Sequence, residues 1–489
     1  MNTKYVTRSR GITTLMVVVF MAIFLLILSA LTGFAFEEAK YSNATLDREQ
    51  ALDSAEGGLE YYRWFLAHFP GNTTNGTGVA GPYAYAVIDP ETGKTTGNAS
   101  ITVTPNTQCG AIQSIDLTSV GTSILGPQYP RTLFARYMQP SVAGYSYLLN
   151  SNVHAGSDRQ ITGPYFSNGG IRMDGTNNST VSSAASTWVC SSSYGCSPTQ
   201  NSAPGVMGNG SGSALWNYPV ASVDFTAITT GLSSIKTYAK NSGGLYFAPA
   251  GSGTTNANQR GYHLIFNSNG TVDVYKVTST IGVAAYPVSG TGGAQTDYSI
   301  INTQTYLGNY TIPVACSVIF VEDRVWVEGT VKGKVTVAAA DFVNASYSPD
   351  AYLVNNINYT TYDGTSGLTV IAEGNVLIPL NSPDIMSVHG IFVAENGSYG
   401  RNFYTNDNSY GTPVPAAYSA YVTRTQLTTN GTVVSNGSTG TQWQCGSPSV
   451  LCSGYANRID SYDELQALSP PPFTPAASTN YQFIQWREL

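Results

Sequence analysis

The chain opens with a long apolar stretch. From Gly11 to Phe36 it contains no Asp, Glu, Lys or Arg and is dominated by Leu, Ile, Val, Phe, Met and Ala. As a helix that rises about 1.5 Å per residue, this stretch would be roughly 35–40 Å long, which is enough to cross a bilayer. It is longer than the apolar region of an ordinary secretory signal. The pattern therefore predicts a transmembrane or assembly helix over residues 12–36.

A helical pattern continues over residues 37–70, where apolar residues recur in steps of three and four. The resulting stripe consists of Leu52, Ala55, Leu59, Tyr62, Leu66 and Phe69. Off this stripe lie Asp47, Arg48, Glu49, Asp53 and Glu56. Pro70-Gly71 ends the helix. The stripe predicts that this half of the helix packs on the domain that follows. Gly57-Gly58 is consistent either with close packing or with a kink.

Short alternating runs of β-forming residues follow Pro70. Residues 71–139 are rich in Gly, Thr and Asn, with alternation over 99–104, which predicts strands of a β-rich region packed on the helix. Over residues 140–400, short apolar runs such as 318–321 end at Gly or Asn corners. Such runs are typical of the rungs of a parallel β-solenoid, in which each rung buries its inward residues on the next. A twisted β-sandwich is the alternative.

Two parts of the chain depart from this pattern. Residues 180–310 predict an insertion in the solenoid, with a helix over 227–240 and a hairpin around Asn269-Gly270. Residues 401–489 predict a polar, turn-rich C-terminal region. The predicted fold class is therefore α+β, with a long N-terminal helix followed by a large, mainly-β head that has β-solenoid portions.

Composition narrows the class of protein. Asp, Glu, Lys and Arg together make up 10% of the 489 residues, against about 25% in an average soluble domain. With 42% hydrophobic residues, the chain can still bury real cores. A formal net charge of -7 argues against a general nucleic-acid binder, which needs a basic stripe. The composition favours an extracellular, β-rich surface over a cytosolic enzyme.

The cysteines also favour an oxidising compartment. They are six in number, and two pairs are close in sequence, which predicts two short disulfide loops and leaves one long-range pair. The predicted pairs are Cys190–Cys196, Cys445–Cys452 and Cys109–Cys316. A zinc site is the alternative, but no pair has the ligand spacing of about two to four residues that such a site uses.

Basic residues indicate the orientation of the apolar stretch. Lys4, Arg8 and Arg10 precede it, and by the positive-inside rule they stay in the cytoplasm. The chain after Glu37 would then face outward. The sequence predicts a single-pass protein of the inner (cytoplasmic) membrane, with its head outside the cell membrane and later at the cell surface.

At these residues the sequence resembles a known family. The leader ending in Ser9-Arg10-Gly11, the apolar stretch and the following helix are similar to the N-terminus of type IV pilin-like proteins, most of all PilX-type minor pilins and K-type pseudopilins. Those proteins carry a helix of the form acid-x-Ala-x-x-x-Ala-Glu-Ala/Gly-Gly-Leu just outside the membrane. Here the pattern is matched by Glu49, Ala51, Ala55, Glu56, Gly57, Gly58 and Leu59. The resemblance covers residues 8–70.

The resemblance implies processing by a prepilin peptidase. Cleavage between Gly11 and Ile12 would remove a leader over residues 1–11 and leave Ile12 with a new, methylated α-amine. Most pilins have Glu at the fifth mature position, where this chain has Met16. In packed subunits that Glu pairs with a neighbour's N-terminal amine, and a buried carboxylate without its partner is costly. Because a tip subunit has no subunit above it, Met16 implies a tip location. Other pilin subunits and inner-membrane lipid would then be the partners of residues 12–36.

The rest of the chain gives little sign of enzyme chemistry. It has no Gly-x-Ser-x-Gly elbow, no phosphate loop and no two His at metal-ligand spacing. The acidic residues of the solenoid region are spread apart, although two of them could still converge across rungs. They include Glu328, Asp341, Asp350, Glu373 and Asp384. We therefore expect no enzyme, no catalytic residues, no metal and no cofactor.

The sequence as a whole predicts a minor, tip-located subunit of a type IV pilus-like filament. Its role would be structural, in assembly, with adhesion at the cell surface through a glycan or protein ligand. The alternative is a single-pass, membrane-anchored surface protein, or a carbohydrate-acting β-helix protein, unrelated to pili. Processing of the leader discriminates between the two.

Overall fold

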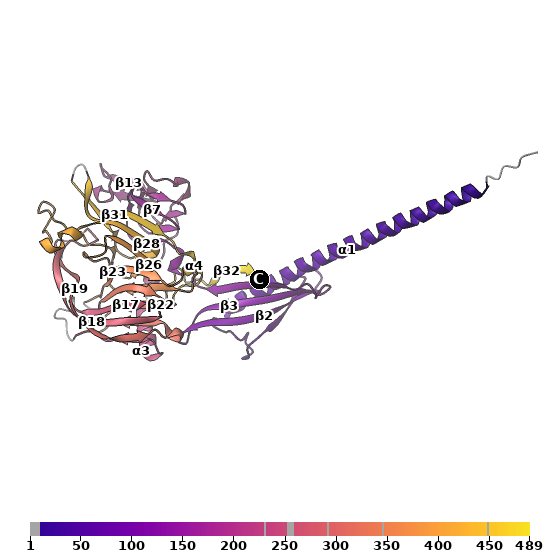
Figure 1. Cartoon of the computed structure of the whole chain (residues 1–489), viewed down its shortest axis with the longest axis horizontal. Helices are drawn as coiled ribbons and strands as arrows, with labels where there is room; N and C mark the ends of the chain where they lie inside the picture. The colour runs from indigo at the N-terminus through magenta and orange to yellow at the C-terminus, as the bar shows by residue number, and fades with distance from the viewer. Residues whose placement is uncertain (1–9, 229–230, 252–258, 291–292, 345–346, 447–448) are drawn as a thin grey trace, which may run out of the picture. The chain divides into compact units, whose positions relative to one another are not determined.

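A computed structural model describes the chain except for residues 1–9, 229–230, 252–258, 291–292, 345–346 and 447–448 (Figure 1). The predicted α+β class is confirmed, because a long N-terminal helix precedes a large β-rich part that contains parallel strands. Contacts divide the chain into two compact units. Unit 1 comprises the residues up to Pro105, Ile115–Tyr137 and Gln485–Leu489, and unit 2 comprises Asn106–Ser114 and Met138–Ile484.

Unit 1 consists of helix α1 (Arg10–His68) and a sheet in the order β1-β2-β3-β4-β32. The strands are β1 (Tyr83–Ile88), β2 (Thr95–Gln108), β3 (Ala111–Ser123), β4 (Arg131–Met138) and β32 (Gln482–Glu488). β1 pairs with β2, and β3 with β4, in antiparallel fashion. α1 ends just before Pro70, whose ring cannot continue a helix.

The second half of α1 packs on this sheet through small residues. Ala55 and Gly58 are buried against it. A Cβ atom placed on Gly58 would lie 2.5 Å from Ser119 Oγ and 2.7 Å from Ala99 Cβ. Because α1 is continuous through this position, Gly57-Gly58 allows close packing and makes no break in the helix.

The predicted apolar stripe of α1 is correct at its centre and wrong at one edge. The buried members are Ala55, Leu59, Tyr62 and Leu66, whereas Phe69 remains exposed. Asp47, which the pattern places off the stripe, is in fact buried and accepts a hydrogen bond from Ser123 Oγ (2.9 Å). A polar group can be buried in this way when it is hydrogen-bonded, which helical periodicity does not reveal.

Unit 2 is a stack of short strands that pair in parallel along three ladders, A, B and C. Ladder A runs through β16 (Leu245–Phe247), β20 (Val318–Val321), β22 (Lys334–Ala339), β24 (Gly367–Ala372), β26 (Ile385–Ala394), β28 (Thr423–Ser435), β5 (Tyr147–Leu149), β8 (Tyr165–Ser167), β11 (Val181–Ser183) and β15 (Trp216–Asn217). Ladder B runs through β17 (Gly261–Asn267), β21 (Val325–Val331), β23 (Ala351–Tyr359), the first halves of β26 and β28, β31 (Val450–Ser461), β7 (Arg159–Ile161) and β10 (Thr176–Asn177).

Ladder C begins with the first residues of β17, β21 and β23 and continues through β25 (Val376–Leu377), β27 (Tyr399–Gly400) and β29 (Thr439–Gly440). A separate parallel sheet contains β6 (Val153–Ala155), β9 (Ile171–Met173) and β14 (Val206–Met207). Smaller elements are the hairpin of β12 (Thr187–Cys190) with β13 (Gln200–Pro204), β30 (Gln442–Cys445), and the helices α2 (Phe225–Ile228), α3 (Leu232–Asn241) and α4 (Glu464–Leu468).

The three ladders surround one apolar core. It takes residues from each of them, such as Ile319 from ladder A, Val331 from B and Val376 from C. Strands of ladder A are apolar on both faces because their outer face is covered as well; there Phe320 packs in one cluster with Ile235 of α3. This is the stacking of a parallel β-solenoid, as distinct from the sandwich that the sequence left open.

The chain does not run through this stack from one end to the other. It enters at β5, in the interior of ladder A, and proceeds through β8 and β11 to β15. It resumes with β16 at the opposite end and returns strand by strand to β28, which pairs with β5. In ladder B the late strand β31 likewise pairs with β7. Strands from the beginning and the end of unit 2 are therefore neighbours in the middle of the stack.

This order differs from the predicted boundaries. Residues 180–310 are not a single insertion. β11 and β15 extend one end of ladder A, whereas β16 begins the opposite end of ladder A and β17 begins ladder B. Within that range, β18 (Thr271–Ala285) and β19 (Gln295–Thr311) form antiparallel pairs, and β17–β18 is the hairpin expected around Asn269-Gly270. The helix expected over 227–240 is divided into α2 and α3, with residues 229–230 outside the described chain. Residues 401–489 are not one polar C-terminal region, because they supply β28 and β31 to the solenoid and β32 to the sheet of unit 1. Local pattern could not show this, because strand pairing is set by contacts distant in sequence.

Candidate functional site

Most of the exposed large apolar side chains of unit 1 lie in the first half of α1. Apolar side chains are exposed from Ile12, at 68% of the full accessible area, to Phe36, at 71%. α1 is the one helix of the described chain that is long and apolar enough to cross a membrane. The predicted segment 12–36 is thus a helix whose apolar side chains find no cover within the described residues.

The positions implied in processing lie at the start of this helix. Gly11, Ile12 and Met16 are in the first turns of α1, and Met16 is exposed. Most of the predicted leader, residues 1–9, lies outside the described residues. Since the segment 12–36 has no ionisable side chain, it presents a wholly uncharged surface.

The six cysteines form three disulfides in unit 2, in the pairs that the spacing suggested. The bonds are Cys109–Cys316, Cys190–Cys196 and Cys445–Cys452. The first joins the hairpin tip Asn106–Ser114 to the short turn Val314–Cys316, where the backbone N–H of Cys109 also donates to the carbonyl of Ala315 (2.8 Å). This bond closes a loop of 207 residues in sequence, and long loops are where a cross-link is expected to restrict the unfolded chain most.

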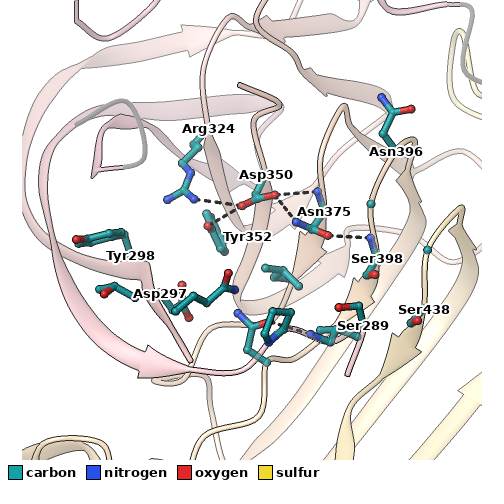
Figure 2. A pocket seen from close by; sticks show the side chains of 18 residues that line it. Ser289, Asp297, Tyr298, Arg324, Asp350, Tyr352, Asn375, Asn396, Ser398 and Ser438 are labelled. Carbon is teal, nitrogen blue, oxygen red and sulfur yellow. Dashed lines mark hydrogen bonds and ion pairs between the residues drawn. The ribbon is translucent and has the colours of Figure 1, made fainter. Parts of the chain in front are cut away.

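A polar groove of about 500 Å³ lies along ladder C (Figure 2). One wall is built from the residues that immediately precede successive ladder C strands, namely Asp350 before β23, Asn375 before β25, Ser398 before β27 and Ser438 before β29. The other wall comes from the start of β19, with Asp297 and Tyr298, and from residues 287–289. Burial raises the pKa of Asp297, whose carboxylate accepts hydrogen bonds from Ser299.

A second cavity, of about 390 Å³, lies beside the paired strands β17 and β21. Its lining includes His263, which lies 2.9 Å from Glu328 through Nε2 and 3.0 Å from Gln304 through Nδ1. The hydrogen bond with His263 lowers the pKa of Glu328. Asp384 lines the same cavity, so two acids that are far apart in sequence do converge across rungs. Within the described ranges, no group of three or more His, Cys, Asp and Glu side chains is arranged to hold a metal ion.

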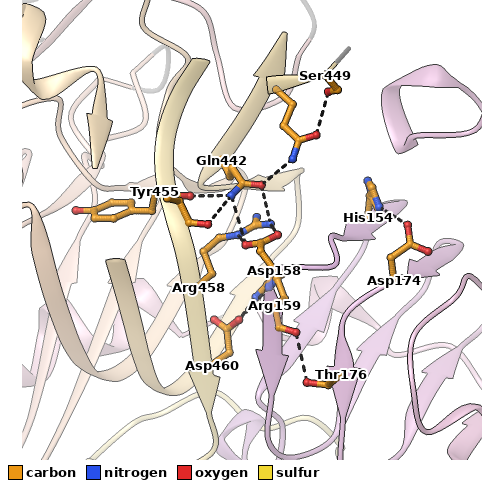
Figure 3. A network of polar contacts seen from close by, with 12 residues as sticks. His154, Asp158, Arg159, Asp174, Thr176, Gln442, Ser449, Tyr455, Arg458 and Asp460 are labelled. Carbon is orange, nitrogen blue, oxygen red and sulfur yellow. Dashed lines mark hydrogen bonds and ion pairs between the residues drawn. The ribbon is translucent and has the colours of Figure 1, made fainter. Parts of the chain in front are cut away.

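A network of ion pairs lies where β31 pairs with β7, in the interior of the stack (Figure 3). Arg159 donates to Asp460 Oδ2 through Nε (2.9 Å) and Nη2 (2.5 Å), and both side chains are buried. Tyr147 donates to the other oxygen of Asp460 (2.6 Å), and the Arg159 guanidinium lies 4.6 Å from the centre of its ring. Arg458 makes a matching bidentate pair with Asp158 (2.6 and 2.7 Å).

Polar side chains also stack at the corners that follow the ladder A strands. Asn150 donates to Asn436 (2.7 Å), and Asn168 donates to Asn150 (2.6 Å), so that a row of amides crosses three neighbouring rungs. Glu395 follows β26 and Glu373 follows β24 at the same corner of their rungs. Burial raises the pKa of both carboxyl groups, and the two charges would also repel each other.

Glu395→Gln is expected to stabilise the protein at about pH 8 and to have little effect at about pH 4. Burial, with the nearby Glu373, raises the pKa of Glu395 to about 9 in the folded chain. An unfolded Glu has a pKa of about 4.3, so the wild type loses stability as the pH rises between these values. Glutamine cannot ionise, and the variant should exceed the wild type by at least about 1.4 kcal/mol at the higher pH, the equivalent of one pKa unit. Thermal unfolding measures this; an identical difference at both pH values would contradict it.

Sequence reasoning singled out Asp350 only as one of several scattered acids and did not find its neighbours in the groove. Asn375, Ser398 and Ser438 lie in different sequence surroundings, and only their position before a ladder C strand unites them. Once the rungs are known, a polar residue directly before a short apolar run is the sequence feature that identifies these positions. Glu395, whose pKa burial raises to about 9, was not singled out either.

Comparisons with known proteins do not identify a family. No protein-family model matches the chain, and no curated protein matches it. Among solved structures, the crystal structure of the competence-associated pilin ComZ from Thermus thermophilus is similar at 13% identity, covering 91% of this chain and 97% of that chain. The TM-score of 0.27 is too low to establish a common fold.

Proposed function

We propose that this chain is a minor subunit of a type IV pilus-like filament, located at its tip, with a structural role in assembly and in surface adhesion. The observation that carries the proposal is the division of α1 into two halves. The second half is buried against the sheet of unit 1, as at Leu59, whereas the first half exposes an uncharged apolar surface over residues 12–36. A helix of this kind is suited to insertion in lipid and then to packing against other apolar helices.

The exposed segment would supply the energy of assembly. In the inner membrane its side chains are covered by lipid, and in a filament they would be covered by the corresponding helices of other pilin subunits. Helix association in such surroundings depends on side-chain packing, and removal of apolar surface from water favours the assembled state outside lipid. No covalent chemistry and no cofactor are needed for this role beyond processing by a prepilin peptidase between Gly11 and Ile12.

Two features support a tip location. Met16 stands where most pilins carry Glu, so the subunit has no carboxylate to pair with the N-terminal amine of a subunit above. Unit 2 alone spans Met138–Ile484, together with a hairpin tip, and so large a body would crowd a helical lattice. A terminal position avoids both an unpaired buried charge and this crowding.

The intact mass and N-terminal residue of the protein from its native membrane or filament fraction test the proposal. We expect a chain that begins at Ile12 with an N-methylated amine, because the apolar helix then starts at its first assembled residue. A chain that keeps residues 1–11 would contradict the proposal and indicate a membrane-anchored surface protein. Immunogold labelling of filaments should find unit 2 at filament ends; labelling along the shaft would contradict the tip location.

A further inference from the structure

The groove along ladder C has a repeating wall. Asp350, Asn375, Ser398 and Ser438 each precede a strand in one of four successive positions of the ladder. Neighbouring strands lie about 4.8 Å apart, so the row extends over roughly 14 Å. A wall of this kind presents polar groups at equal intervals along one line, which suits a linear ligand better than a compact one.

The wall is held in place by its own hydrogen bonds. Asp350 Oδ1 accepts from both the backbone N–H and the side-chain amide of Asn375 (2.8 Å each), and Asn375 Oδ1 accepts from the backbone N–H of Ser398 (2.8 Å). Figure 2 shows these three residues in a row, with Asp297 and Tyr298 to one side. Asp350 also pairs with Arg324 (3.2 Å), so its charge is compensated. The wall is therefore rigid before any ligand arrives and has little excess charge.

Other lining groups keep their hydrogen-bonding capacity. Within the described chain, the side chains of Tyr298, Asn396 and Ser438 make no hydrogen bond, and Asn396 is exposed. An amide both donates and accepts, a hydroxyl does the same, and a tyrosine ring adds a flat apolar face at low entropic cost. Sugars present the matching chemistry, since each ring has hydroxyls that donate and accept and a C–H face that packs on aromatic rings.

From these contacts we infer that the groove binds an uncharged oligosaccharide, which lies along ladder C and spans several rungs. An apolar small molecule would find too few apolar groups in the lining. A polyanion would find no uncompensated cation, because Arg324, the one Lys or Arg among the lining residues, is paired with Asp350. The inference takes its biological setting, a receptor at the cell surface, from the proposed function, but the binding itself involves unit 2 alone.

The test uses the full chain, purified in a detergent without a sugar headgroup. Cellohexaose, chitohexaose and maltohexaose are titrated by calorimetry, together with hexagalacturonate and an uncharged Gly-Ser peptide. We expect at least one neutral hexasaccharide to bind saturably, with a Kd between about 10 μM and 1 mM, and its disaccharide to bind at least about tenfold more weakly because it spans fewer rungs.

Variants of the open lining groups place the binding in the groove. Tyr298→Ala and, separately, Asn396→Ala should each weaken binding by roughly tenfold or more, whereas Tyr410→Ala, at an exposed tyrosine outside the groove, should not. Because Asn396 is exposed, we expect Asn396→Ala to keep the fold even if Tyr298→Ala does not. Absence of saturable binding by all three neutral hexasaccharides overturns the inference. Preference for hexagalacturonate or the peptide, or unchanged affinity in both groove variants, overturns it as well. The N-terminal mass tests the filament proposal separately, so the two failures are distinguishable.

Discussion

Replacing Arg159 by methionine is expected to reduce the free energy of unfolding of unit 2 by about 3–5 kcal/mol. Arg159 and Asp460 are both buried, and the guanidinium is the cation that compensates the carboxylate, to which Tyr147 also donates. Methionine fills much of the same volume but leaves Asp460 as a buried charge without its ion-pair partner. The pair also joins β7 to β31, so its loss weakens the contact between the early and late parts of the chain.

Urea unfolding of the full chain in detergent measures this effect. Arg63→Met is the matched control, because Arg63 pairs with Glu60 on the surface of α1 with both side chains about half exposed, and exposed pairs contribute at most about 1 kcal/mol. The double variant Arg159→Met/Asp460→Leu should recover part of the loss, since it leaves no buried charge unpaired. A loss in Arg159→Met no larger than in Arg63→Met would show that the pair does not hold the stack together.

Alanine at two adjacent glycines of α1 is expected to change stability in opposite directions. Gly58→Ala should destabilise unit 1 by about 1–3 kcal/mol, because the new Cβ would lie 2.5 Å from Ser119 Oγ and 2.7 Å from Ala99 Cβ. Gly57→Ala should stabilise it by up to about 1 kcal/mol, the gain in helix propensity, because its Cβ meets nothing closer than Val87 Cγ2 at 3.4 Å.

The two substitutions are chemically identical, so each serves as the control for the other. Thermal unfolding gives the sign of each change, and the rate of proteolysis within β1 and β2 reports whether the sheet has loosened from α1. If both variants were stabilised equally, α1 would not be held against the sheet at Gly58. The Gly57-Gly58 pair would then have no packing role.

The sequence was most informative where structure depends on near neighbours. The apolar run over residues 12–36 and the periodicity through Leu59 and Tyr62 predict α1, and Asn269-Gly270 predicts its hairpin. Close spacing also suggested the pairs Cys190–Cys196 and Cys445–Cys452. In each case a few consecutive residues determine the outcome, through helical repeat, turn geometry or the short reach of a disulfide.

Features that depend on distant pairing could not be predicted. Arg159 and Asp460 are separated by 301 residues, and nothing local to either indicates that they share a buried site. The groove has the same origin, since Asp350 and Ser398 become neighbours of Asn375 only through the register of ladder C. Asp47 was misjudged for a related reason, because its acceptor role depends on Ser123, on another element.

The strand order of unit 2 also determines where it resists mechanical force. Apart from the hairpin tip Asn106–Ser114, the backbone enters unit 2 at Met138 and leaves it at Ile484, within β32. The ladder strands nearest in sequence to these two points, β5 and β31, are each hydrogen-bonded to strands on both sides. Tension in the backbone at these points is therefore delivered to the interior of the stack, and it cannot peel away an outermost strand first. The strands at the ends of ladder A, β15 and β16, are connected only through internal parts of the chain. Tension carried by the backbone at Met138 and Ile484 would thus have to break bonds on both sides of the central rungs together.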